Sequence, residues 1–165
     1  MREVPLPGAD GLRCAMGTKA RPPRTVRVYV DMVGDLFHAG HVELLRAARE
    51  RGVHLIVGVL SDETAGSYKR RPIMTLDERV AVVAACRYVD EVVPDAPFQP
   101  DEQVLTKHDI ALVVHGDDLT PEGAASVYGA AVAAGRLAYV PRTSGISTTE
   151  LIQRVLDAKD AGRLG

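Results

Sequence analysis

The chain has 165 residues, 46% of them hydrophobic, and a formal net charge of −2. This length suits one domain with a buried core, and the slightly acidic balance argues against nucleic-acid binding, which needs a basic surface. No apolar run reaches the roughly 18 residues of a membrane span, and the chain does not begin with the apolar core of a signal peptide, so we predict a cytoplasmic protein without a stable membrane anchor. The two cysteines, Cys14 and Cys86, indicate neither a disulfide framework nor a cysteine-based metal site.

Residues 1–24 show no helix or strand periodicity, and prolines and charges are scattered through them. We predict that they form a flexible N-terminal tail. Regular patterns begin at Thr25. We therefore place one domain at residues 25–158, followed by a short C-terminal end at residues 159–165.

Five apolar segments have the length and composition of buried strands, at residues 26–30, 53–60, 89–93, 110–115 and 137–140. Segments between and after them predict helices over residues 42–49, 75–86, 101–108, 123–134 and 147–156, the first closed by Gly52 as a C-cap. Thr75 with Glu78, and Ser147 with Glu150, have the spacing of capping boxes. Residues 61–74 are predicted to form a polar loop.

Strands that alternate with helices predict a parallel sheet with right-handed crossovers. The expected fold class is α/β: a Rossmann-like, doubly wound, five-stranded parallel sheet with helices on both faces. Ligands of such sheets bind at the carboxyl ends of the strands. The polar segments 31–41, 61–71, 115–120 and 141–148 follow strands and should meet at that edge.

The run His38-Ala39-Gly40-His41 lies between the first strand and the first helix. A helix N-terminus offers free N–H groups and a partial positive charge, which suit a phosphate, and two imidazoles add further donors. Gly40 lets a ligand approach the backbone. From the residues alone two other interpretations stay open, a pair of surface histidines and a pair of metal ligands. The metal pair is the weaker one because no cysteine or glutamate partner is nearby.

A second run, RTSGISTT, extends from Arg142 to Thr149. It combines a planar cation with hydroxyl and N–H groups at a helix N-terminus. Together the two runs resemble the cytidylyltransferase family of the HxGH nucleotidyltransferase superfamily, which carries the signature RTxGISTT. Residues 72–79, 86–93 and 114–118 are similar to phosphocholine and phosphoethanolamine cytidylyltransferases. The resemblance covers about residues 25–157.

This resemblance implies a split clamp around the triphosphate of CTP. His38, His41, Lys69 and Arg142 would be the catalytic residues. Magnesium would arrive with CTP, with no metal ligand from the protein, and residues 87–93 would help build a homodimer. Without the resemblance, Lys69 and Arg79 would be interpreted as solvated surface cations and Asp117 as a turn residue. The residues expected to bind the nucleotide are Val33, Asp35, Phe37, Gly40, Arg79, His115, Asp117, Ile146, Ser147 and Thr148.

The acceptor site is expected to contain Asp31, Lys69, Phe98 and Tyr128. In choline-type enzymes an aspartate at the end of the first strand faces the amine, and Asp31 matches it, whereas the similar glycerol-phosphate enzymes carry a neutral residue there. Phe98 and Tyr128 would form part of an aromatic wall, worth about 0.5–2 kcal/mol against a cation; core packing is an equally good interpretation of either one alone.

The chain departs from the family at three places close to this site. Met32 and Gly34 stand where the family usually has a glycine and an aromatic residue, and Leu119-Thr120-Pro121 fills a region where a further cage tyrosine is expected. An incomplete cage favours a small amine such as ethanolamine, or a related amino-alkyl phosphate or phosphonate. Met32 would narrow the acceptor or the nucleotide pocket.

The predicted activity is that of a CTP-dependent nucleotidyltransferase. CMP would pass from CTP to a small phosphorylated amino alcohol of the phosphoethanolamine or phosphocholine type, and pyrophosphate would leave. Two alternatives remain: a glycerol-3-phosphate cytidylyltransferase or other HxGH nucleotidyltransferase, and a non-catalytic nucleotide-binding module.

Overall fold

The computed structural model describes residues 26–164, so the predicted tail at residues 1–24 lies outside the described residues. The described part contains five strands and seven helices. They are β1 (Arg27–Met32), α1 (Ala39–Arg49), β2 (His54–Val59), α2 (Asp62–Tyr68), α3 (Leu76–Ala84), β3 (Glu91–Pro94), α4 (Glu102–Lys107), β4 (Leu112–Gly116), α5 (Pro121–Val127), α6 (Gly129–Ala133), β5 (Leu137–Val140) and α7 (Thr148–Asp160).

The five strands form one parallel sheet in the order β3-β2-β1-β4-β5. The predicted fold class is therefore confirmed. Because the chain moves outward from β1 to β3 and then returns to the other side with β4, the order reverses between β1 and β4. In doubly wound sheets a ligand crevice opens at this reversal.

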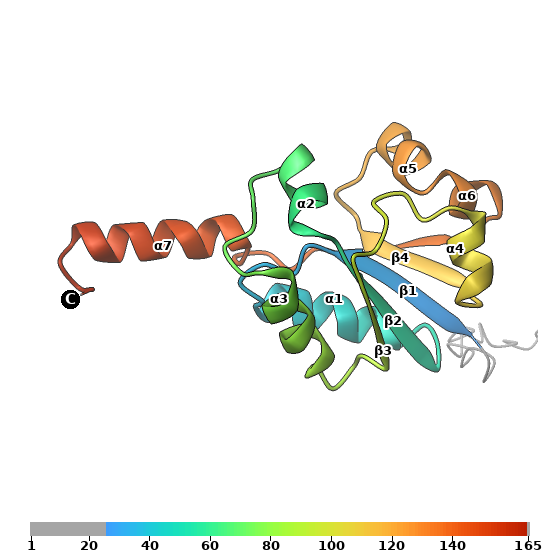
Figure 1. Cartoon of the computed structure of the whole chain (residues 1–165), viewed down its shortest axis with the longest axis horizontal. Coiled ribbons are helices and arrows are strands. Elements are labelled where there is room, and N and C mark those ends of the chain that lie inside the picture. The colour runs from blue at the N-terminus through green and yellow to red at the C-terminus, as the bar shows by residue number, and fades with distance from the viewer. Residues whose placement is uncertain (1–25, 165) are drawn as a thin grey trace, which may run out of the picture.

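Each face of the sheet has its own core, because alternate strand residues point to opposite sides. Val28, Val30 and Met32 of β1 pack with α1 and α3 on one face. Tyr29 points to the other face and packs with residues of α4, α6 and the α5–α6 junction. Figure 1 shows these two helix layers on either side of the sheet. Burial on both faces explains why the β1 and β2 sequences are almost continuously apolar.

The segment 61–74, predicted to be a loop, contains the helix α2. Ser61 caps this helix by accepting a hydrogen bond from the Thr64 N–H at 3.1 Å, and Asp62 and Glu63 lie in its first turn. Only Ala65 of α2 is buried, so the sequence carries no apolar period that would indicate a helix here.

The predicted helix 123–134 is two helices, α5 and α6, which meet at Tyr128. The break turns the Tyr128 ring into the core, where only 1% of the residue is exposed. The predicted C-cap is also wrong: Glu50 caps α1, and Gly52 instead permits a close approach, because a Cβ there would overlap Val28 of β1 and the carbonyl of the preceding Val26.

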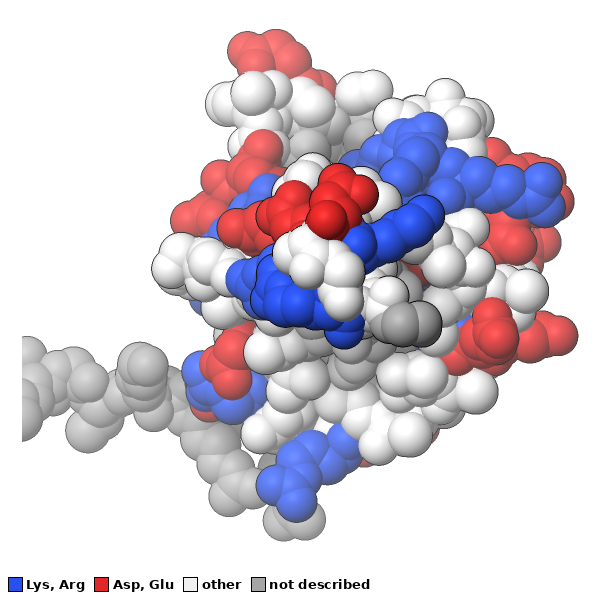
Figure 2. All heavy atoms as spheres, turned by 90° about the vertical axis from the view of Figure 1, so that its left-hand side faces the viewer, with Lys and Arg blue, Asp and Glu red and all other residues white. Residues whose placement is uncertain are grey.

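Helix α7 projects away from the sheet (Figure 1), and none of its residues is buried. It runs to Asp160, past the predicted domain boundary at residue 158. The apolar side chains of Val155 and Leu156 are exposed on it. No helix in residues 26–164 has both the length and the apolar composition needed to cross a bilayer. On the face from which α7 extends, Figure 2 shows acidic and basic side chains intermixed.

Candidate active site

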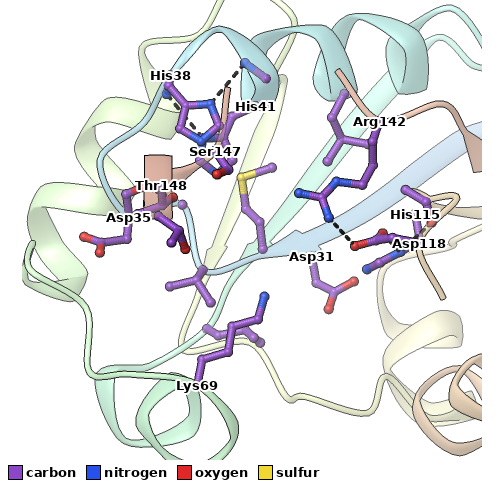
Figure 3. A pocket seen from close by; sticks show the side chains of 18 of the residues that line it. Asp31, Asp35, His38, His41, Lys69, His115, Asp118, Arg142, Ser147 and Thr148 are labelled. Carbon is purple, nitrogen blue, oxygen red and sulfur yellow. Dashed lines mark hydrogen bonds and ion pairs between the residues drawn. The ribbon is translucent and has the colours of Figure 1, made fainter. Parts of the chain in front are cut away.

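A cavity of about 840 Å³ opens at the carboxyl ends of the strands, next to the point where strand order reverses. Its lining residues come from the ends of β1 and β4, from the segments after all five strands, from the starts of α1 and α7, from the end of α2 and from the α5–α6 junction. Two unlike regions face one another across it (Figure 3). We call them the imidazole end (His38, His41, Ser147 and Thr148) and the carboxylate end (Asp31, Tyr68, Phe98 and Tyr128).

The two histidines of the imidazole end cap helix α1. His38 is the N-cap residue, and its Nδ1 accepts a hydrogen bond from the Gly40 N–H at 3.1 Å. The Nδ1 of His41 accepts one from the His38 N–H at 3.2 Å, which completes a reciprocal capping box. A Cβ on Gly40 would stand 2.9 Å from Cε1 of His38, so a glycine is needed for this close packing.

These bonds determine how the rings can act. Because each Nδ1 accepts a backbone N–H, each neutral ring carries its proton on Nε2, which remains available as a donor. The ring centroids lie 4.0 Å apart. Burial, together with the neighbouring His38, lowers the pKa of His41 to about 4, and burial lowers the pKa of His38. Both rings are therefore neutral hydrogen-bond donors at pH 7.

Helix α7 contributes a second N-terminus to the imidazole end. Ser147 is its N-cap, with Oγ accepting from the Glu150 N–H at 3.2 Å. The N–H groups of Thr148 and Thr149, in the first turn, have no partner within the helix. The Thr148 hydroxyl donates to the Asp35 carbonyl at 3.0 Å, which ties this N-terminus to the loop after β1. Two helix N-termini and two imidazoles thus converge, an arrangement suited to a group with several negative oxygens.

Asp31 is the centre of the carboxylate end. It lies in β1 with 8% of its surface exposed, and its Oδ1 accepts a hydrogen bond from the Tyr128 hydroxyl at 2.7 Å. Burial raises the pKa of Asp31, although the Tyr128 bond and the electrostatic interactions with His115 and Lys69 oppose the rise. A buried carboxylate without a cationic partner at bonding distance favours a cationic ligand.

Tyr68 and Phe98 form an aromatic wall at the same end. Their ring centroids are 4.6 Å apart, and both residues line the cavity. Lys69, the C-cap of α2, places its Nζ 5.5 Å from the Tyr68 ring centroid. Figure 3 shows the Lys69 side chain reaching toward the middle of the cavity. This cation can therefore contact an anionic group held between the two ends.

Arg142 follows β5 and is held by two neighbouring carboxylates. Its guanidinium bonds Asp118 at 2.9 Å, and its backbone N–H donates to Asp117 at 3.0 Å. Figure 3 shows the side chain turned toward Asp118 rather than toward the imidazoles. Because 57% of the Arg142 side chain is exposed, this ion pair is weak, and an anion in the cavity competes with it readily.

Asp35 fixes the loop that follows α2. Its carboxylate accepts hydrogen bonds from the backbone of Ile73 and Met74, and an Arg70 nitrogen lies 2.6 Å from it. Burial alone would raise the pKa of Asp35, but the bonds from Met74, Ile73 and Arg70 outweigh burial and lower it. The carboxylate is thus occupied by the protein's own donors.

The structure brings most of the predicted site residues to the cavity but leaves three outside its lining. Phe37 stacks on His41 at 5.2 Å and lines a separate apolar groove beside α7. Asp117 is exposed and bonds the Arg142 backbone. Arg79 is fully buried. The predicted residues that do line the cavity are Asp31, Val33, Asp35, His38, Gly40, His41, Lys69, Phe98, His115, Tyr128, Arg142, Ile146, Ser147 and Thr148.

The guanidinium of Arg79 holds together the segments that frame the cavity. It donates to the carbonyls of Val33 and Leu60, which follow β1 and β2, and to the Asp62 carboxylate at the start of α2. With no exposed surface, it has no face left for a nucleotide. Arg79 therefore maintains the shape of the site. It is neither the nucleotide contact nor the solvated helix arginine that the sequence predicted.

Tyr68 and Asp118 are among the lining residues outside the predicted set. Tyr68 lies in the segment predicted to be a loop; within α2, Ala65 and Tyr68 show the i,i+3 spacing of one helix face. For Asp118, the prediction named its neighbour Asp117 instead. A strand-end Gly-Asp-Asp gives no signal as to which aspartate faces the cavity, because a turn can present either one.

An α/β sheet with a strand-order reversal, two helix N-termini and paired imidazoles defines a protein of the doubly wound class with a cavity suited to anions. The sequence identifies the group within this class. Residues 34–154 match the cytidylyltransferase-like family, and the chain belongs to that family.

Curated relatives carry the same resemblance. The chain is 39% identical over 160 residues to an ethanolamine-phosphate cytidylyltransferase of Arabidopsis thaliana, covering 93% of this chain and 38% of the relative. It is 44% identical over 135 residues to the ethanolamine-phosphate cytidylyltransferase of Mus musculus, covering 81% and 33%. It is 42% identical over 136 residues to choline-phosphate cytidylyltransferase A of Homo sapiens, covering 81% and 37%.

The chain thus spans between a third and two fifths of the length of these relatives. A solved structure, a lipopolysaccharide core biosynthesis protein from Thermoplasma volcanium, superposes with a TM-score of 0.58 at 23% identity, covering 74% of this chain and 98% of the other. This likeness supports the fold.

Proposed function

We propose that this chain transfers CMP from CTP to a small phosphorylated amino alcohol and releases pyrophosphate. The observation that carries the proposal is the pairing of unlike ends in one cavity. The imidazole end offers neutral donors and helix N-termini for a triphosphate, and the carboxylate end offers a buried anion beside aromatic rings for an ammonium group.

The reaction needs no general base from the protein. The second pKa of an acceptor phosphate is about 6, so the group is largely dianionic at neutral pH. One of its oxygens attacks the α-phosphorus of CTP in line, forming a new P–O bond. The bond between the α-phosphorus and the bridging oxygen breaks, and pyrophosphate leaves with that electron pair.

The residues contribute position and charge. His38 and His41 donate from Nε2 to phosphate oxygens, and the α7 N-terminus holds the β- and γ-phosphates. Lys69 contacts both the acceptor phosphate and the α-phosphate, whose mutual repulsion it reduces. Arg142 leaves Asp118 for the triphosphate. Asp31 pairs with the ammonium group and sets the distance of the acceptor phosphate from the α-phosphorus.

We propose that magnesium enters with CTP and offsets phosphate charge. Within residues 26–164 no group of three or more His, Cys, Asp or Glu side chains is placed to hold a metal ion. A metal bound chiefly by the nucleotide accounts for this donor set. Adding excess EDTA should abolish turnover, and adding magnesium should restore it.

A panel of nucleotides and acceptors tests the proposal. CTP or ATP is combined with phosphoethanolamine, phosphocholine, 2-aminoethylphosphonate or glycerol 3-phosphate; pyrophosphate release is followed, and the nucleotide product is identified by mass spectrometry. We expect turnover with CTP and at least one amine. Activity only with ATP, or only with glycerol 3-phosphate, would contradict the proposal. Binding of CTP by calorimetry without turnover for any acceptor would instead indicate a non-catalytic nucleotide-binding module.

The assembly and location of the protein are also proposals. Residues 87–93 resemble a segment that helps build a dimer in the family, and β3 lies at an edge of the sheet, where a second subunit can approach. Light scattering coupled to size exclusion should give a mass near twice the 17.7 kDa of one chain.

Fractionation of cells should place the protein in the cytoplasm.

A further inference from the structure

The Tyr29 hydroxyl lacks a partner in the protein interior. Tyr29 is 1% exposed, and its Oη is the one buried side-chain nitrogen or oxygen in the described part of the chain with no hydrogen-bond partner. Buried hydroxyl groups are almost always bonded, because an unpaired one costs stability. A phenylalanine would fill the same space without that cost. Packing in the empty protein therefore does not explain why this position carries a hydroxyl group.

The hydroxyl lies beside the carboxylate end. Tyr29 and Asp31 are two residues apart in β1, so their side chains leave the sheet on the same face. The β1–β2 register pairs Asp31 with Gly58, and a Cβ on Gly58 would overlap the Tyr29 hydroxyl. The hydroxyl thus lies over the residue directly opposite Asp31. The same point over Gly58 is 2.8 Å from Cβ of Ala96, two residues before Phe98 of the aromatic wall.

Asp31 has room for a second donor. A carboxylate accepts through two oxygens, and Tyr128 is the one described side chain that donates a hydrogen bond to Asp31, through Oδ1. The negative charge of Asp31 contributes to a raised pKa at Tyr29, at Tyr68 and at Tyr128, so three tyrosines lie within its field. Tyr128 is already bonded, and Tyr68 is exposed on the aromatic wall. Tyr29 is the deeply buried hydroxyl still free to donate.

We propose that Tyr29 is a positioning residue for Asp31, and that its hydroxyl donates to the second carboxylate oxygen when an ammonium-bearing acceptor binds. This inference rests on the proposed function. In the empty protein the two groups are not within bonding distance. A small shift of the Tyr29 ring, or one bridging water molecule, joins them once Asp31 carries a full charge.

The reason for such a device is the burial of Asp31. Burial favours its neutral form, whereas pairing with an ammonium group needs the charged form. Each hydrogen bond donated to the carboxylate favours the charged form. Tyr128 from the α5–α6 junction supplies one such bond, and the electrostatic interactions with His115 and Lys69 act in the same direction. A bond from Tyr29 to the second carboxylate oxygen adds to these.

The substitution Tyr29→Phe removes the hydroxyl and keeps the ring. With CTP saturating, we expect KM for the amine acceptor to rise about tenfold, while kcat and KM for CTP stay within about twofold of wild type. Because Asp31 loses a donor to its charged form, the acidic limb of kcat/KM for the acceptor should move to higher pH. A purely structural role would not move this limb. Without ligands, the variant should melt at or above the wild-type temperature.

Tyr139→Phe is the matched control, since Tyr139 lies in β5 with 40% of its surface exposed. A second comparison uses calorimetric binding of phosphoethanolamine to Asp31→Asn with and without Tyr29→Phe. If Tyr29 acts through Asp31, its substitution has no further effect once the carboxylate is gone.

Several results would overturn the inference. A Tyr29→Phe enzyme with wild-type KM and pH profile, or with equal losses for CTP and acceptor, would do so. A variant that fails to fold would show that the hydroxyl is needed in the empty protein. If the wild-type chain transfers CMP to no amine, the proposed function is wrong and this inference falls with it; if the wild type is active and Tyr29→Phe behaves normally, only this inference is wrong.

Discussion

The imidazoles of His38 and His41 are each held by a backbone N–H no more than three residues away, whereas the Asp31 carboxylate is held by the Tyr128 hydroxyl, 97 positions along the chain. The histidine pair at one end of the cavity is therefore built by local capping geometry, and the other end by packing between distant elements. His38 and His41 take their places wherever the strand-loop-helix unit forms, and the bond from the Thr148 hydroxyl to the Asp35 carbonyl adds the α7 N-terminus to them. The carboxylate end depends on the relative placement of β1, α2, the β3–α4 segment and the α5–α6 junction.

This contrast suggests a division of labour between the ends. In the proposed reaction, the imidazole end would recognise phosphates, which every substrate of this reaction type contains. The carboxylate end would recognise the non-phosphate group of the acceptor. Substitutions at the imidazole end should therefore slow turnover with every acceptor, and substitutions at the carboxylate end should change the choice between acceptors.

The largest effect is expected from His41→Ala. Removing the Nε2–H donor should lower kcat by about 10²–10³-fold or more with every acceptor alike, because a lost donor at the reacting phosphate is not replaced by water. The variant also loses part of the α1 capping box, worth about 1 kcal/mol, so thermal melting should fall only slightly. Steady-state kinetics and circular dichroism measure both effects.

His54→Ala is the control. His54 is the first residue of β2 and so lies at the amino-terminal end of the strands, whereas the cavity opens at their carboxyl ends. It should leave turnover unchanged. A His41→Ala enzyme with near-normal kcat, or one that loses activity with a single acceptor only, would break the proposed division between the two ends.

Asp31→Asn should act on the acceptor alone. The change keeps the shape but removes the charge, so KM for an amine acceptor should rise about 10- to 100-fold while KM for CTP stays constant. Equal losses for both substrates would indicate a structural role for Asp31. Glycerol 3-phosphate, whose alcohol end carries no charge, serves as the reference acceptor and should bind no worse to the variant than to wild type.

The stability of Asp31→Asn should also depend on pH. The pKa of Asp31 is raised in the folded protein, so folding favours the protonated form and the charged form costs stability above that pKa. At pH 8 Asp31→Asn should therefore melt at a higher temperature than wild type. The difference should shrink as the pH falls and wild-type Asp31 becomes protonated. Differential scanning calorimetry at several pH values checks this.

A smaller effect on activity is expected from Asp35→Asn. The Asp35 carboxylate holds the loop that follows Lys69 and belongs to neither the imidazole end nor the carboxylate end of the cavity. Losing its bonds to Ile73, Met74 and Arg70 should cost about 1–3 kcal/mol in the free energy of unfolding. KM for CTP and for the acceptor should both rise a few fold. Urea unfolding and kinetics measure the two effects.

The stability effect of Asp35→Asn should depend on pH in the opposite sense to that of Asp31→Asn. The pKa of Asp35 is lowered on folding, so its contribution is complete above about pH 4 and is lost as the pH falls through the folded-state pKa. Arg70→Ala is the control: it removes only a half-exposed partner and should cost less than about 1 kcal/mol. A stability loss that does not change between pH 7 and pH 3 would contradict this assignment.

The sequence by itself determined the five-stranded sheet, the helix caps and the two predicted phosphate-binding segments of the imidazole end. These features depend on interactions between near neighbours: alternating or continuous apolar runs for strands, and caps such as Thr75 with Glu78 or Ser147 with Glu150 for helix starts. Such patterns can be recognised in consecutive residues. Segments 38–41 and 142–149 could be placed at the same edge of the sheet because the carboxyl ends of parallel strands lie at one edge.

Only the tertiary structure decided where Arg79 and Tyr68 act and how Tyr128 is held. In the sequence Arg79 resembles an ordinary helix arginine, but in the fold three separate segments surround its guanidinium. The helix is interrupted at Tyr128, whose ring packs in the core and whose hydroxyl bonds Asp31. Tyr68 belongs to a helix with a single buried residue. In each case the stabilising contact joins residues far apart in the chain, and no local periodicity encodes such a contact.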